Sequence, residues 1–208
     1  MTERIPLMVN IQGKSVFCIG GGKVASKRIP LLIKGGANVI VISPTLHEEL
    51  EVYMSDFHWE KRELHEAESF NADLLFIATN NQQLNDDLLR MVREGQWVYA
   101  AHNAEKSDFH FPAVLHEPPI TLTISTGGAY PAYLPKLKQI LKETLQNEHI
   151  LDDLTYLSEV RINIANSSLT LEQKTSLLRA CATDEFLRHP ERAKLLEQWK
   201  EEVLVSKQ

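Results

Sequence analysis

Short apolar runs alternate with amphipathic segments through the first half of this 208-residue chain. Four of the runs have the composition of strands that are buried on both faces: 15–19, 38–43, 73–78 and 97–101. A fifth run, 57–62, is partly polar, which predicts a strand nearer the edge of the sheet. Helices are predicted between the strands at 23–34, 46–53 and 82–94. Strands that alternate with helices predict an α/β fold with a Rossmann-type, doubly wound parallel sheet.

The pattern changes near residue 114. Residues 120–125 alternate apolar and polar side chains, which predicts a strand with one solvated face. The remainder has helical spacing of its apolar residues, with helices expected at about 131–147, 149–166, 170–181 and 184–204. A helical half that lacks the strand–helix alternation predicts a separate module after the α/β domain.

Composition and charge narrow the classes of partner. The chain is 43% hydrophobic and 24% charged, with a net charge of −6 and a pI near 5.8. This balance gives no support to a nucleic-acid partner or to an anionic membrane surface. No apolar run has the length of a membrane span, and no signal peptide is evident. Cys18 and Cys181 have no metal-ligand spacing, so we expect no metal site and a reduced, cytoplasmic protein.

Residues 20–25, Gly-Gly-Gly-Lys-Val-Ala, carry the strongest chemical signal, because they match the G-x-G-x-x-A form of the dinucleotide-binding fingerprint. Gly20 permits the tight turn, Gly22 removes a side chain where backbone meets pyrophosphate, and Ala25 lets helix and strand pack closely. The helix that follows presents free N–H groups and a partial positive charge to the phosphates. The match follows a predicted strand and opens a predicted helix, so we expect a bound dinucleotide and not a merely structural turn.

The second predicted strand ends at Ser43-Pro44-Thr45. Common dinucleotide sites place an acidic residue here, which binds the ribose 2′-OH. The hydroxyls of Ser43 and Thr45, together with backbone groups, could hydrogen-bond the adenosine ribose in its place. No arginine lies immediately alongside, which disfavours a 2′-phosphate. Since the usual carboxylate is missing, these residues leave both NAD and NADP open.

Two further strand ends carry candidate functional residues. Thr79, Asn80 and Asn81 follow the fourth strand, and residues at such ends line the ligand crevice of open α/β sheets. Thr79 and Asn80 are therefore candidate cofactor contacts, although an asparagine here also suits the N-cap of the next helix. His102 follows the fifth strand, where it is either an acid or base near neutral pH or a structural histidine.

The loop 125–131, Ser-Thr-Gly-Gly-Ala-Tyr-Pro, leads from a predicted strand into a helix. Its hydroxyls and backbone N–H groups could bind carboxylates, or they could simply cap the helix. Lys136 and Lys138 either add positive charge to such a site or face solvent. The helix starts at Pro131 or nearer Pro135, because proline suits the first position of a helix and not its interior.

Together these motifs resemble the precorrin-2 dehydrogenase / sirohydrochlorin ferrochelatase family, which includes the N-terminal region of sirohaem synthase. The matching segments, in order and spacing, are GGGKVASKR (20–28), VIVISP (39–44), IATNNQQLN (77–85), FHFPAVL (109–115) and ISTGGAYP (124–131). The resemblance covers about residues 5–145. The helical tail is similar to the family's C-terminal domain in length and character.

The resemblance implies a homodimer that catalyses NAD-dependent dehydrogenation of precorrin-2 to sirohydrochlorin in sirohaem biosynthesis, a branch of porphyrin biosynthesis. Its parts would be an NAD-binding Rossmann domain at 1–113, a small α+β dimerisation segment at 114–147 and a C-terminal helical domain at 148–208. By similarity, NAD contacts fall on Gly20, Gly22, Lys23, Val24, Pro44 and Thr45, with Gly21, Ser43, Thr79 and Asn80 beside them. The tetrapyrrole substrate has eight carboxylates, which gives a binding role to Ser125, Thr126, Gly127, Gly128 and Lys136.

One position departs from the bifunctional members of this family, which carry an aspartate shortly after the fifth strand. Counting back from Pro112 places His102 there, with Tyr99 in place of an asparagine. This substitution resembles the dehydrogenase-only branch, so His102 is the candidate catalytic residue and iron insertion is the less expected activity. Because no carboxylate stands at that position, a non-catalytic NAD(H)-binding or redox-sensing module is the alternative function.

Overall fold

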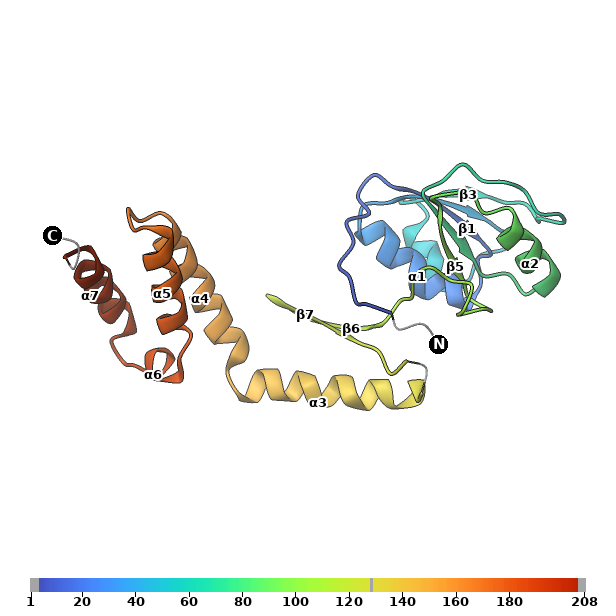
Figure 1. The fold of residues 1–208 in the computed structure, drawn as a ribbon. Helices are drawn as coiled ribbons and strands as arrows, with labels where there is room; N and C mark the ends of the chain where they lie inside the picture. The colour runs from blue at the N-terminus through green and yellow to red at the C-terminus, as the bar shows by residue number, and fades with distance from the viewer. Residues whose placement is uncertain (1–3, 128, 206–208) are drawn as a thin grey trace. The chain divides into compact units, whose positions relative to one another are not determined.

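A computed structural model describes residues 4–127 and 129–205 of the chain (Figure 1). The chain divides into two compact units, residues 1–111 and 112–208. The first unit has hydrophobic cores on both sides of a sheet, and the second has a core among helices.

The described residues of the first unit form a five-stranded parallel sheet with the order β3-β2-β1-β4-β5. Its strands are β1 (Ser15–Ile19), β2 (Asn38–Ile42), β3 (His58–Glu60), β4 (Leu74–Ile77) and β5 (Trp97–Ala100). The Rossmann-type sheet predicted from the sequence is confirmed, and the partly polar β3 lies at its edge. The order reverses between β1 and β4, which is where such sheets bind ligands.

Neighbouring residues along the central strands face opposite cores. Cys18 of β1 packs in the core beneath α1 (Lys23–Lys34), whereas Ile19 packs in the core beneath α2 (Gln82–Arg90). Successive side chains of a strand alternate between faces, and helices cover both faces of this sheet (Figure 1). The central strands are therefore apolar at nearly every position, which is the pattern that the sequence shows.

Two predicted helices of this unit are shorter than expected. The segment 46–53 forms a 3₁₀-helix, η1 (Glu48–Tyr53), which is a geometry that suits short segments. The helix predicted to reach residue 94 ends at Arg90. The Arg93 N–H donates to the side-chain oxygen of Gln96 at 3.3 Å, so it does not extend the helical ladder.

The second unit begins with an antiparallel hairpin of β6 (Ala113–Glu117) and β7 (Ile120–Ile124). The expected strand with a solvated face is β7, whereas β6 was not predicted, although Ala113, Val114 and Leu115 of its five residues are apolar. Lys142 Nζ lies 2.8 Å from Glu117 Oε1 and ties α3 (Leu134–Asn147) to β6.

The rest of the second unit is helical, as predicted, but the last predicted helix is divided. Pro190 lies in the break, because proline has no N–H for the helical ladder. Phe186 is buried here, and its ring centroid lies 5.4 Å from that of Trp199. The helices are α4 (Ile150–Ala165), α5 (Leu171–Cys181), α6 (Asp184–Leu187) and α7 (Arg192–Val205).

Both cysteines are buried and free. Burial raises the pKa of each thiol, to about 11 for Cys181. Each therefore acts as a small apolar core residue. Among the described residues, no helix has both the length and the apolar character that a membrane crossing requires.

Candidate functional site

A crevice of about 300 Å³ opens at the carboxyl ends of the central strands. It lies at the point where the strand order reverses, which is the usual ligand position of a doubly wound sheet. The lining residues follow four neighbouring strands: 19–22 at the end of β1, 42–45 at the end of β2, 63–64 after β3, and 78–81 with Leu84 after β4.

The glycine turn after β1 is packed tightly against its neighbours. Gly20 has a φ of +107°, and a Cβ there would collide with the carbonyl oxygen of Ala78. A Cβ on Gly21 would lie 2.5 Å from Ser43 Oγ and 2.7 Å from the carbonyl oxygen of Thr45. These two glycines are therefore required so that the three strand ends can meet.

Gly22 is different, because a Cβ there would have no described atom within 4 Å. It is the N-cap of α1 in an extended conformation, with no side-chain cap and no acidic residue in the first helical turn. The first N–H groups of α1 are thus open to a ligand, and the helix end favours negative charge. This open backbone cradle fits the pyrophosphate of a dinucleotide.

The polar groups of Ser43, in the turn after β2, form hydrogen bonds within the protein. The Ser43 hydroxyl donates to the carbonyl oxygen of Thr45, and the Ser43 carbonyl accepts from Trp59 Nε1 at 3.0 Å. The proton of the Ser43 hydroxyl is therefore engaged within the protein, where the sequence suggested a ribose contact. Pro44 and Thr45 line the crevice with Ser43, whereas Lys23 and Val24 are exposed and are not among its lining residues.

The turn after β4 is fixed by buried Asn85 of α2. Thr79 Oγ1 donates to Asn85 Oδ1 at 2.5 Å, and Asn85 Nδ2 donates to the Thr79 carbonyl at 3.0 Å. Asn81 Oδ1 accepts from the Leu84 N–H at 3.1 Å and caps α2. The capping role thus belongs to Asn81, and Asn80 lines the crevice beside it.

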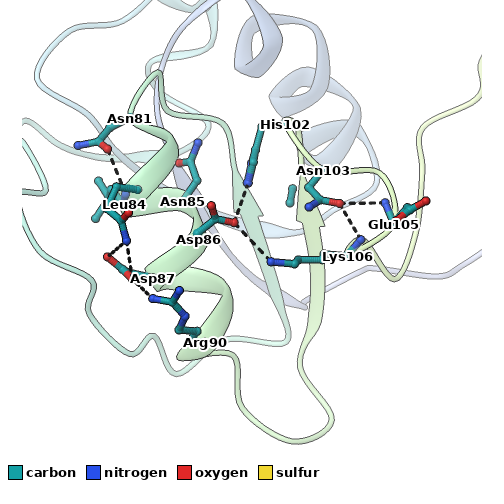
Figure 2. Close-up of polar contacts among 12 residues, drawn as sticks. Asn81, Leu84, Asn85, Asp86, Asp87, Arg90, His102, Asn103, Glu105 and Lys106 are labelled. Carbon is teal, nitrogen blue, oxygen red and sulfur yellow. Dashed lines mark hydrogen bonds and ion pairs between the residues drawn. The ribbon is translucent and has the colours of Figure 1, made fainter.

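His102 lies in the turn that follows β5, outside the residues that line the crevice. Figure 2 shows His102 and Lys106 converging on Asp86 of α2. His102 Nε2 lies 3.6 Å from Asp86 Oδ1, and Lys106 Nζ lies 3.4 Å from the same oxygen. Asn103 Oδ1 accepts the Lys106 N–H at 3.1 Å, which orders the turn. The imidazole is thus held by a carboxylate at the edge of the sheet that carries the crevice.

The loop expected to bind carboxylates belongs to the second unit. Ser125 Oγ accepts from the Gly127 N–H at 3.3 Å, and Gly127 has a φ of +60°. Thr126 closes a turn through its carbonyl oxygen, which accepts from the Ala129 N–H at 3.0 Å. Gly128, the fourth expected contact, lies outside the described residues.

The helix after this loop starts close to the second of its two predicted positions. A 3₁₀ turn, η2 (Pro131–Tyr133), precedes α3, and Pro135 lies in the first turn of α3. Lys136 is exposed, with its Nζ 5.6 Å from the ring centroid of Tyr133.

Sequence reasoning missed Glu63 and Leu64, which line the crevice after β3. Their position directly after a parallel strand was the available signal, because carboxyl ends of adjacent strands share one edge. Within the described residues, no group of three or more His, Cys, Asp and Glu side chains is placed to hold a metal ion.

The sequence and fold have counterparts among known proteins. A family model described as "Putative NAD(P)-binding" matches residues 7–113, half of the chain. "Precorrin-2 dehydrogenase" of Bacillus subtilis (strain 168) is 25% identical over 150 residues, which cover 71% of this chain and 93% of that protein. "Siroheme synthase" of Tolumonas auensis is 28% identical over 149 residues, but these cover only 32% of its length and 71% of this chain.

A solved structure, "SirC, precorrin-2 dehydrogenase", has a TM-score of 0.76 to this chain at 24% identity. The match covers 96% of this chain and all of that one. The two proteins therefore share the fold across both units.

The contrast between Gly21 and Gly22 gives a test of the crevice. Gly22→Asp should keep or slightly raise the thermal stability, because aspartate is a favoured N-cap. It should weaken dinucleotide binding more than about tenfold, since its carboxylate would face the phosphates. In Gly21→Ala the added methyl group would collide with Ser43 and Thr45. This variant should therefore lower the free energy of unfolding by about 1–3 kcal/mol.

Calorimetric titration with NAD and thermal unfolding would measure both effects on the same preparations. Undiminished NAD binding by a folded Gly22→Asp variant would contradict the placement of the phosphates.

Proposed function

This chain belongs to the NAD(P)-binding family whose model covers residues 7–113, and we propose that it is an NAD-dependent precorrin-2 dehydrogenase of sirohaem biosynthesis. The observation that carries the proposal is the match to a precorrin-2 dehydrogenase over 93% of that protein, on a chain whose first strand ends in an open glycine cradle. We place the reaction in the cytoplasm, a proposal supported by the two free cysteines.

Conversion of precorrin-2 to sirohydrochlorin removes two hydrogen atoms from the macrocycle, one as a hydride and one as a proton. NAD held in the crevice would supply the hydride acceptor. The chain itself then has three tasks: to hold the dinucleotide, to hold a substrate with many carboxylates, and to receive a proton.

The cofactor is held chiefly by backbone groups in this proposal. Gly20 and Gly21 fix the turn, and Gly22 leaves the start of α1 open to the pyrophosphate. Lys23, the first residue of α1, adds a positive charge at the same helix end. Ser43, Pro44 and Thr45 after β2, and Thr79 and Asn80 after β4, line the crevice and would contact the rest of the dinucleotide.

We assign the substrate carboxylates to the loop of the second unit. Ser125 and Thr126 supply hydroxyls, and Gly127 supplies the left-handed turn that shapes the loop around them. Lys136 adds a charge near the start of α3. Charged and N–H donors of this kind bind carboxylates through short, charge-assisted hydrogen bonds.

We further propose that residues 114–147 form the interface of a homodimer. Two strands alone are marginally stable in water, and Leu122 and Ile124 of β7 remain only partly buried. Tyr130 and Ile140 are exposed in the described structure. A second copy of the chain would cover these apolar side chains.

Sedimentation velocity should therefore find a dimer at micromolar concentration, and a purely monomeric protein would contradict this assembly.

His102 is proposed to receive the substrate proton. An imidazole nitrogen can act as a general base, and Asp86 Oδ1, 3.6 Å from Nε2, orients the ring. Lys106 on the same carboxylate oxygen limits the movement of Asp86. Asp86 is thus a positioning residue in this proposal, and His102 is the residue that meets the substrate.

The decisive experiment incubates the purified chain with precorrin-2 and NAD. We expect NADH to accumulate together with the absorption spectrum of sirohydrochlorin. A parallel sample with Fe(II) separates dehydrogenation alone from an additional iron insertion, which we do not expect. Binding of NAD without oxidation of the tetrapyrrole would reject the enzyme in favour of a non-catalytic binding module.

Substitution of His102 tests the proton acceptor. His102→Ala should lower kcat by about 10²–10⁴-fold while leaving the KM for NAD unchanged, because the histidine is outside the crevice lining. Asp86→Asn should lower kcat by a smaller factor. The matched control is His58→Ala, an exposed histidine of β3, which should retain full activity. Full activity of His102→Ala would remove this residue from the mechanism.

A further inference from the structure

Glu63 lines the crevice beside the end of β2, where the sequence has no acidic residue. It follows β3 and lines the crevice with Ser43 and Thr45 of the neighbouring strand end. Its side chain is 64% exposed, and its nearest ionic partner is His65, whose Nε2 lies 4.0 Å away. The carboxylate is therefore accessible to a ligand in the crevice.

Strand pairing explains how a residue twenty positions along the chain reaches this place. Ile42 of β2 is in register with Glu60 of β3, and the Ser43 N–H donates to the Glu60 carbonyl at 3.3 Å. The segments that follow β2 and β3 therefore leave the sheet side by side. The residue at the usual acidic position, Ser43, has its hydroxyl proton engaged by Thr45. The end of the adjacent strand, β3, therefore supplies a carboxylate where the end of β2 has none.

The two cations that precede Glu63 in the chain, Lys61 and Arg62, are engaged in other contacts. Arg62 donates to Glu60 at 2.9 Å and to both carboxylate oxygens of Glu68 at 2.8 and 2.9 Å. These bonds raise the pKa of Arg62, with Glu68 the larger cause. Lys61 Nζ lies 5.3 Å from the ring centroid of Trp59. A 2′-phosphate entering this side would thus meet Glu63, while the neighbouring guanidinium of Arg62 is already paired with Glu60 and Glu68.

We propose that Glu63 makes the crevice selective for NAD over NADP. The carboxylate accepts a hydrogen bond from the adenosine ribose and repels the 2′-phosphate of NADP. A carboxylate at the end of the second strand does this in common dinucleotide sites, and here the third strand takes over the task. The inference rests on the proposed function, because it assumes a nicotinamide dinucleotide in the crevice.

Calorimetric titration of the full chain with NAD and with NADP measures this selectivity directly, without substrate. The wild-type protein should bind NAD more tightly than NADP. Glu63→Gln should reduce the preference for NAD, measured as the ratio of the NADP to the NAD dissociation constant, by about tenfold or more. The reason is that a neutral amide does not repel the 2′-phosphate. Glu66→Gln is the matched control, since this exposed residue is outside the crevice lining, and it should leave the ratio unchanged.

The outcomes separate the two levels of the proposal. An unchanged ratio in Glu63→Gln, or an equal loss of affinity for both dinucleotides, would overturn the selectivity role while leaving the dehydrogenase intact. A wild-type protein that prefers NADP would overturn it as well. Failure of the wild-type protein to bind either dinucleotide would instead reject the proposed function. Glu63→Arg provides a second variant, which should improve NADP binding further by pairing with the 2′-phosphate.

Discussion

The close contact of the Gly20–Gly21 backbone with the turns after β2 and β4 is the constraint on which the site depends. Gly20 lies against the carbonyl of Ala78, and Gly21 lies against Ser43 and Thr45. A side chain at either position would push the strand ends apart. Because the turns meet without side chains between them, α1 starts at the edge of the sheet and its first N–H groups open on the crevice.

Most polar side chains around the crevice form hydrogen bonds with other groups of the protein. Ser43 closes its own turn, Asn85 fixes Thr79, and Asn81 caps α2. Such bonds set the loops before a ligand arrives, so that less ordering free energy is lost on binding. The groups left for a ligand are mainly backbone N–H groups and a few charged side chains. This division fits a site that recognises the phosphates and ribose of a common cofactor.

The two units contribute different chemistry. The dinucleotide crevice lies wholly within the first unit, whereas the hydroxyls and the lysine assigned to substrate carboxylates belong to the second. In the proposed function the first unit binds the cofactor, and the substrate carboxylates are assigned to residues after Pro112. This explains why the glycine fingerprint indicated a cofactor but no reaction, and why the substrate was expected only from the later segments.

The sequence by itself determined the parallel sheet, helix 23–34 and the glycine turn, because local periodicity and glycine spacing encode them directly. It predicted the later helices less well, since the last one was expected to run unbroken over 184–204 and is divided at Pro190. Only the tertiary structure placed Glu63 beside Ser43 and turned His102 towards Asp86. Both placements arise from contacts between segments that are distant in the chain. The position of Glu63 after a strand predicts the edge of the sheet that it reaches but not its neighbour, and no spacing in the sequence pairs His102 with Asp86.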